Sequence, residues 1–230
     1  MILVSWEPPS VFDYQYSKEV LDLFGTVLTW HDDMVDGKKF VKIHYPFKRD
    51  LMPNLPSFQE RKFLCMINAN KKFNDFEKEL YTLRRNLVSF CEDKPLGTLD
   101  IYGSEWGFSK NSKGWVDDKL ETLKEYKFIF CVENAHVPGY VTEKLFDSFA
   151  AGAIPIYLGA TNIEEYIPSN CYIDFSQFSD FEAMLSFLQK VTEEEYEAYL
   201  QNIQTFLKSP ESEKFTYEAY EKVLLNVLKK

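Results

Sequence analysis

The chain lacks the cysteine patterns that mark disulfide scaffolds and metal sites. It has four cysteines in 230 residues, and no two of them form a Cys-x-x-Cys pair. A chain of this length buries enough surface to fold without covalent cross-links. Single, widely spaced cysteines favour buried, reduced thiols over a metal site. We therefore expect four free thiols, at Cys65, Cys91, Cys131 and Cys171.

Long apolar runs and an excess of positive charge are also missing. Nothing approaches the roughly 18 consecutive apolar residues of a membrane-spanning helix, and the opening "MILVSWEPP" lacks the basic region of an export signal. The formal net charge is -10, from 36 acidic and 26 basic residues, so there is no basic stripe for nucleic acid. We expect a cytoplasmic protein with no transmembrane segment and no nucleic-acid partner, and leave peripheral membrane association open.

What the chain does contain is a repeated alternation of strand and helix patterns. Apolar strand-like runs alternate with helical periodicity between residues 60 and 175, and one helix is predicted over "DFEKELYTLRRNLVSFCED", residues 75–93. This alternation predicts an α/β fold with a doubly wound, Rossmann-type parallel sheet. We divide the chain into a partial N-terminal α/β region (1–57), a Rossmann-like domain (58–208) and a C-terminal helix that packs on the fold (209–230).

One gap between two buried elements is unusually polar. The apolar run "FIFCV" ends at Glu133 and Asn134, a Pro-Gly turn follows, and a helical pattern begins after Thr142. In a doubly wound sheet, ligands bind beyond the carboxyl ends of strands and beside helix N-termini. Gly139 allows a sharp turn, and Thr142 is a plausible N-cap. The gap is therefore the best candidate for a binding site.

The residue types in this gap suit a phosphorylated sugar. A helix start offers free N–H groups and partial positive charge, which favour an anion such as phosphate. Lys144 in the first turn is unfavourable there unless an anion is bound beside it. Glu143 and Asn134 could bind hydroxyl groups, and Tyr140 could cover the ligand or stack on it. The alternative interpretation is a simple capping arrangement with a solvated lysine, and no glycine-rich phosphate-binding motif decides between the two.

The same stretch carries a family resemblance. The segments "KLETLKEYKFIFCVEN", "PGYVTEKLFDSFAAGAIPIYLG", "NIEEYIP" and "CYIDF" resemble the C-terminal donor-binding region of the α-1,3-fucosyltransferases, glycosyltransferase family ten. The resemblance is strong over residues 115–180, fair over 60–206 and thinner over 1–50, where it rests on "WEPP" and "TVLTWHDDM". It implies a GT-B-like fold with a partial acceptor domain at the N-terminus. It also implies inverting transfer of L-fucose from GDP-fucose to a glycan hydroxyl, as an α-1,3 linkage to an N-acetylglucosamine-type sugar.

The resemblance also implies roles for individual residues. The donor-binding positions of the family fall on Asn134, Tyr140, Val141, Thr142, Glu143 and Lys144, with Glu133 and Gly139 as weaker candidates. The family uses an arginine on the helix after the first donor-domain strand. This is Arg85 of "LRRNL", with Arg84 as the competing register, and a guanidinium suits a diphosphate because it makes paired, charge-assisted hydrogen bonds.

A glutamate near the N-terminus is the candidate catalytic base. Glu7 of "WEPP" occupies the place of the family's Glu-x-Pro glutamate, and a carboxylate there could take the proton of the acceptor hydroxyl. The pair Asp32 and Asp33 is interpreted as a solvated turn. We expect no metal site and no required cofactor besides the donor substrate GDP-fucose, and leave open stimulation by manganese without a dedicated site.

Two other functions remain open at this point. The chain could transfer a different GDP-sugar or use a different acceptor. It could also be a non-catalytic sugar-nucleotide-binding module, although a module that only binds has no use for the base Glu7. An unpaired sheet edge within residues 1–50 would favour a homodimer.

Overall fold

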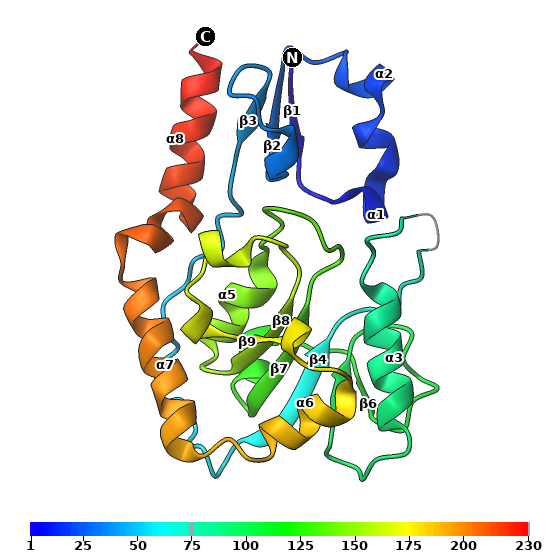
Figure 1. The fold of residues 1–230 in the computed structure, drawn as a ribbon. Coiled ribbons are helices and arrows are strands. Elements are labelled where there is room, and N and C mark those ends of the chain that lie inside the picture. The colour runs from blue at the N-terminus through cyan, green and yellow to red at the C-terminus, as the bar shows by residue number, and fades with distance from the viewer. Residues whose placement is uncertain (74–75, 230) are drawn as a thin grey trace.

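The computed structural model describes residues 1–73 and 76–229, and it consists of two parallel sheets placed end to end (Figure 1). We call residues 1–57 the small half and residues 58–208 the large half. The small half holds a three-stranded parallel sheet in the order β1-β2-β3. Its strands and helices are β1 (Ile2–Ser5), α1 (Pro9–Phe12), α2 (Lys18–Leu21), β2 (Thr26–Thr29) and β3 (Phe40–Lys42).

The large half is a doubly wound α/β unit. Its six strands pair in parallel in the order β6-β5-β4-β7-β8-β9. The strands are β4 (Lys62–Ile67), β5 (Asp100–Tyr102), β6 (Ser112–Gly114), β7 (Tyr126–Val132), β8 (Ile154–Leu158) and β9 (Ile173–Asp174). The helices are α3 (Tyr81–Cys91), α4 (Lys119–Leu123), α5 (Glu143–Ala150), α6 (Phe181–Leu188) and α7 (Glu193–Leu207). The predicted α/β class and parallel sheet are confirmed.

The core of the molecule lies around β7. This strand reads as a continuous apolar run because helices cover both faces of a parallel sheet, so side chains on both faces are buried. Phe128 and Phe130 are each 1% exposed. All four cysteines are free and buried, as predicted. Among the described residues, no helix is both long and apolar enough to cross a membrane.

The predicted helix over residues 75–93 was wrong at its start. Asp75 lies outside the described residues, and α3 begins only at Tyr81. The segment before it pairs with the loop after β7 instead: Leu80 N donates to Asn134 O at 3.1 Å, and His136 N donates to Lys78 O at 2.8 Å. These bonds occupy backbone groups that a longer helix would need. The short elements α1 and β6 were not predicted, because a single turn and a three-residue strand carry too little periodicity.

The C-terminal helix returns to the small half. The chain leaves α7, passes through a 3-10 turn over Pro210–Phe215, and forms α8 (Tyr217–Leu228) beside the small sheet (Figure 1). The rings of Trp6 and Tyr220 lie 5.3 Å apart across this contact. The division into three parts, including a last part that packs on the fold, stays a prediction.

Candidate functional site

The candidate site lies where the strand order of the large sheet reverses. Strands β5 and β6 are added on one side of β4, and β8 and β9 on the far side of β7. Loops that leave the carboxyl ends of strands at such a point diverge, and the crevice between them is where open α/β sheets bind ligands. The loops after β4 and β7 begin at Asn68 and Glu133. The polar gap identified in the sequence therefore occupies this crevice.

Glu133 is the buried anion at the centre of the site. Its carboxylate is 0% exposed and accepts hydrogen bonds from Thr142 N at 2.9 Å, Thr142 Oγ1 at 2.7 Å and Lys144 Nζ at 3.0 Å. Gly159 makes room for it, because a Cβ there would lie 2.4 Å from Glu133 Cγ. A buried carboxylate is tolerated only when it is paired and hydrogen-bonded in this way.

Helix α5 begins at the site with a lysine in its first turn. Thr142 caps the helix, as predicted, and its Oγ1 accepts from Lys144 N at 3.4 Å. Burial alone would lower the pKa of Lys144, but the charges of Glu133 and Glu143 outweigh burial and raise it. The anion that stabilises Lys144 beside the positive end of the helix is thus Glu133. The Lys144 side chain remains 16% exposed and can still meet a ligand.

Glu143 is the more open of the two glutamates. Its side chain is 35% exposed, and its carboxylate lies 3.5 Å from Lys144 Nζ and 3.8 Å from Lys119 Nζ. Burial alone would raise its pKa, but the two lysines lower it below its usual value. Glu143 is therefore ionised at neutral pH and able to accept hydrogen bonds from hydroxyl groups.

Of the two candidate arginines, Arg84 is the one that the structure brings to the site. Arg84 is 2% exposed on the inner face of α3 and donates to Val132 O at 3.1 Å and to Asn134 Oδ1 at 2.9 Å. Arg85 is half-buried, and among the described residues no side-chain hydrogen bond or ion pair involves its guanidinium. Arg84 fixes the end of β7 and orients Asn134, whereas the role of Arg85, the preferred candidate from the sequence, stays a prediction.

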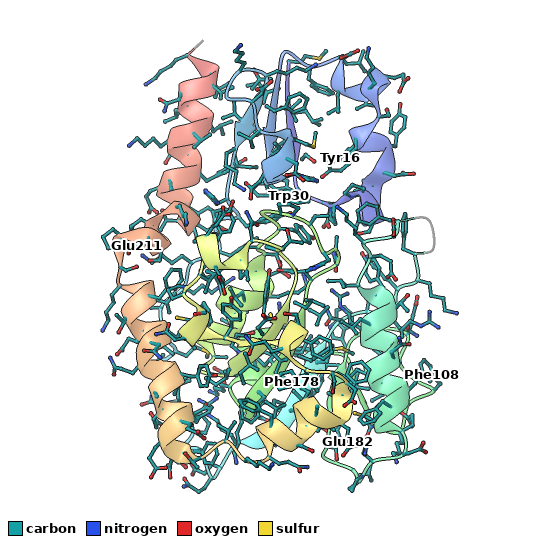
Figure 2. The ribbon with its side chains drawn as sticks, viewed as in Figure 1. Tyr16, Trp30, Phe108, Phe178, Glu182 and Glu211 are labelled. Carbon is teal, nitrogen blue, oxygen red and sulfur yellow. The ribbon has the colours of Figure 1, made fainter. Side chains whose placement is uncertain are left out.

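Tyr140 lies between the two halves instead of over the crevice. It is 1% exposed, and its ring packs against Trp30 at 4.5 Å and Tyr45 at 6.0 Å. Figure 2 shows Trp30 at the junction between the small sheet and the large half. Gly139 and Val141, its neighbours in the chain, are also buried. Tyr140 therefore joins the halves, and its ring has no open face for stacking on a ligand.

Glu7 faces the site from the small half. It follows β1 and is half-buried, and its backbone oxygen accepts from Tyr16 Oη at 2.7 Å. Ser10 Oγ, on the adjoining α1, donates to Asn134 O at 3.4 Å and ties this segment to the end of β7. Burial raises the pKa of Glu7, and the charge of Lys144 is the strongest opposing influence. The charges of Glu7 and Lys144 therefore interact across the junction between the two halves.

An open groove extends the site along the carboxyl ends of β4, β5 and β6. It encloses about 390 Å³ and includes Asn68, Trp115, Asp117 and Lys119 in its lining. Lys119 and Asn68 also line the small recess beside Lys144, so the groove and the recess share these two residues as walls. Trp115 is 76% exposed at the groove wall. Sequence reasoning missed Lys119 and Trp115, and the available signal was their position within residues 115–180, where the family resemblance is strong.

Two further predictions concern acidic residues. Asp33 is exposed, as expected of a solvated turn, but that interpretation was wrong for Asp32, whose carboxylate accepts three side-chain hydrogen bonds. Within residues 1–73 and 76–229, no group of three or more histidine, cysteine, aspartate or glutamate side chains is arranged to hold a metal ion.

Comparisons with known proteins match this region. The family model described as "Glycosyltransferase family 10 (fucosyltransferase) C-term" matches residues 77–222. The chain is similar to an alpha-(1,4)-fucosyltransferase of Arabidopsis thaliana, with 35% identity over 77 residues, covering 34% of this chain and 19% of that protein. It is also similar to the alpha-(1,3)-fucosyltransferase FucT of Helicobacter pylori, with 32% identity over 84 residues, covering 36% and 18%. The matches thus span about a fifth of these relatives.

A solved structure shares the fold over the whole chain. An alpha1,3-fucosyltransferase crystallised with GDP-fucose aligns with a TM-score of 0.63 and 17% identity, covering 100% of this chain and 75% of that one. At this identity the likeness shows the fold alone, which is the GT-B-like arrangement of two facing α/β units.

Proposed function

Because the chain belongs to glycosyltransferase family 10, the fucosyltransferases, we propose that it transfers L-fucose from GDP-fucose to a glycan hydroxyl. The reaction proceeds with inversion at the anomeric carbon and forms an α-1,3 linkage to an N-acetylglucosamine-type sugar. The observation that carries the proposal is the position of Glu7 at the junction, where Ser10 Oγ of the adjoining α1 donates to Asn134 O at 3.4 Å and Lys144 is the strongest charge that opposes the raised pKa of Glu7. Glu7 supplies a base and Lys144 a cation, and inverting transfer needs both.

The donor lies along the crevice of the large half. Its diphosphate contacts Lys144 and Lys119, which line the same recess, because ammonium groups make strong charge-assisted hydrogen bonds to phosphate. Its nucleoside extends into the groove beside Trp115. Glu143 accepts hydrogen bonds from donor hydroxyls. Arg84 does not contact the donor itself, and it contributes by holding the Asn134 side chain in place through a hydrogen bond.

The chemical step uses groups from both halves. Glu7 takes the proton of the acceptor hydroxyl as its oxygen attacks the anomeric carbon of fucose. The bond between that carbon and the β-phosphate oxygen breaks, and its electron pair leaves with GDP. Lys144 and Lys119 stabilise the charge that develops on the leaving diphosphate. A base in a half-buried site with a raised pKa has greater proton affinity than an exposed glutamate.

Calorimetric titration with GDP-fucose tests the proposal, together with transfer assays on glycans that end in N-acetylglucosamine or N-acetyllactosamine. Glu7→Gln should bind GDP-fucose within about twofold of the wild type and lose about 100-fold or more of the transfer rate. Lys144→Ala should weaken binding by about tenfold or more. Because Lys144→Ala also disturbs Glu133, Lys119→Ala is a second variant with the same expected direction, and melting curves check each fold.

Two results would argue against this function. If the wild type binds neither GDP-fucose nor GDP, the family fold serves another purpose in this chain. If it binds GDP-fucose but Glu7→Gln transfers fucose at the wild-type rate, Glu7 is not the base. Binding of GDP with no preference for GDP-fucose over another GDP-sugar would favour the alternative donor.

A further inference from the structure

The carboxylate of Asp32 accepts hydrogen bonds from both halves beside the site. Asp32 follows β2 in the small half and accepts from Lys42 Nζ at 2.6 Å, within its own half. It also accepts from Tyr166 Oη at 2.6 Å and from Asn162 Nδ2 at 2.9 Å, which both belong to the large half. Charge-assisted bonds of this length are the strong class of protein hydrogen bonds.

The network continues into the loop that carries the site. Asn162 Oδ1 accepts from Gly139 N at 2.9 Å, and Asp32 N donates to Pro138 O at 3.4 Å. Gly139 has φ of 79°, and a Cβ there would lie 2.4 Å from Trp30 O. The loop therefore meets the end of β2 too closely for any residue but glycine. The same loop leads, three residues later, to the helix cap Thr142.

Asp32 and Glu7 are held in register by the small sheet. Strands β1 and β2 are parallel, and Ser5 lies opposite Thr29. Glu7 follows the end of β1 by two residues, and Asp32 follows the end of β2 by three. A displacement of Asp32 from the large half would therefore carry Glu7 with it, because paired strands move as one unit.

The surroundings of Asp32 keep it ionised. Burial alone would raise its pKa, but the hydrogen bonds from its three partners outweigh burial and lower it. Lys42 Nζ lies 5.0 Å from the centre of the Tyr166 ring, and Lys214 Nζ lies 4.8 Å from it. The charged acceptor of the network, Asp32, thus belongs to the small half. Its donors are one cation, Lys42, and two neutral groups from the large half, Asn162 and Tyr166.

We propose that Asp32 is a positioning residue that holds the small half against the site loop, so that Glu7 faces the donor across the crevice. Its role as a lock between the halves rests on the geometry of the network alone. The consequence for transfer rests on the proposed function, because it assumes that Glu7 is the base. Asp33, next in the chain and exposed, is the matched control.

Spin-label distance measurements test the lock directly. The native cysteines are buried, so labels attach selectively to Leu23→Cys in the small half and Leu96→Cys in the large half, which are 63% and 71% exposed in the wild type. The doubly labelled protein with Asp32 unchanged should give one narrow distribution of distances between the two labels. Asp32→Asn should broaden it, and Asp33→Asn should leave it narrow. Tyr166→Phe, which removes one bond and no charge, should broaden it to a smaller extent.

Activity supplies the second readout. In Asp32→Asn the Kd for GDP should stay within about twofold of the wild type, while the transfer rate from GDP-fucose falls about tenfold. A merely structural defect would instead weaken GDP binding and lower the melting temperature together. Distributions as narrow as the wild type in both Asp32→Asn and Tyr166→Phe would overturn the proposal. If the wild type neither binds GDP nor transfers fucose, the proposed function fails, and the label distances still decide whether Asp32 locks the halves.

Discussion

Neutralising Glu133 should destabilise the protein more than neutralising any exposed acid. Glu133 is 0% exposed, and Lys144 Nζ lies 3.0 Å from its carboxylate. In Glu133→Gln, Lys144 loses its charged partner while its side chain stays mostly buried. Removing one member of a buried ion pair costs about 3–5 kcal/mol, because the other charge is left uncompensated.

Two features of the site reduce the expected loss of stability. The Lys144 side chain is 16% exposed, and Glu143 lies 3.5 Å from Nζ and compensates part of its charge. The glutamine oxygen can also still accept from Thr142. We therefore expect a loss of about 2–3 kcal/mol in the free energy of unfolding. For a chain of this length, that lowers the melting temperature by roughly 4–12 °C.

Thermal denaturation and urea unfolding measure the loss. Glu143→Gln is the control, because this glutamate is 35% exposed and its ion pairs are longer, so it should cost less than about 1 kcal/mol. Adding Lys144→Met to Glu133→Gln should recover part of the stability, since it removes the uncompensated charge. A Glu133→Gln protein that melts within about 1 °C of the wild type would refute the reasoning, as would a double variant less stable than the single one.

Two more predictions concern the acidity of the base and the turn before the site helix. Burial raises the pKa of Glu7, and the base works only when deprotonated, so the transfer rate should fall with decreasing pH at values above the ordinary range of glutamate. Lys144 opposes this shift, so Lys144→Met should move the acid limb of the pH–rate profile to higher pH, and a limb that stays in place or moves lower would contradict this. Gly139→Ala places a Cβ 2.4 Å from Trp30 O at φ of 79°, so urea unfolding should show a loss of about 2–4 kcal/mol. An unchanged urea midpoint would mean that the loop can move away from β2.

The parts of the site that the sequence predicted correctly are local. The apolar run of β7 and the cap Thr142 can be identified from adjacent residues, because burial on both sheet faces and helix capping each leave a short-range pattern. In a doubly wound parallel sheet, the carboxyl end of such a strand lies at the edge where ligands bind. This reasoning needs no knowledge of contacts between distant segments.

The parts that the sequence did not predict depend on distant partners. Arg84 and Arg85 are adjacent, and only the packing of α3 on β7 decides which one faces Asn134. Asp32 binds side chains 130 and 134 residues away, and nothing near it in the chain indicates them. An adjacent pair of aspartates therefore looked like a solvated turn, although one of them joins the halves.

The return of α8 to the small half has a mechanical consequence. Both chain ends lie at the same end of the molecule, and the large half is connected to the small half by two chain crossings (Figure 1). Tension applied between the termini would pass first through the contact between α8 and the residue that follows β1, where Tyr220 meets Trp6. The crevice of the large half lies outside that load path, so pulling on the ends would peel the last helix away before it strained the large sheet.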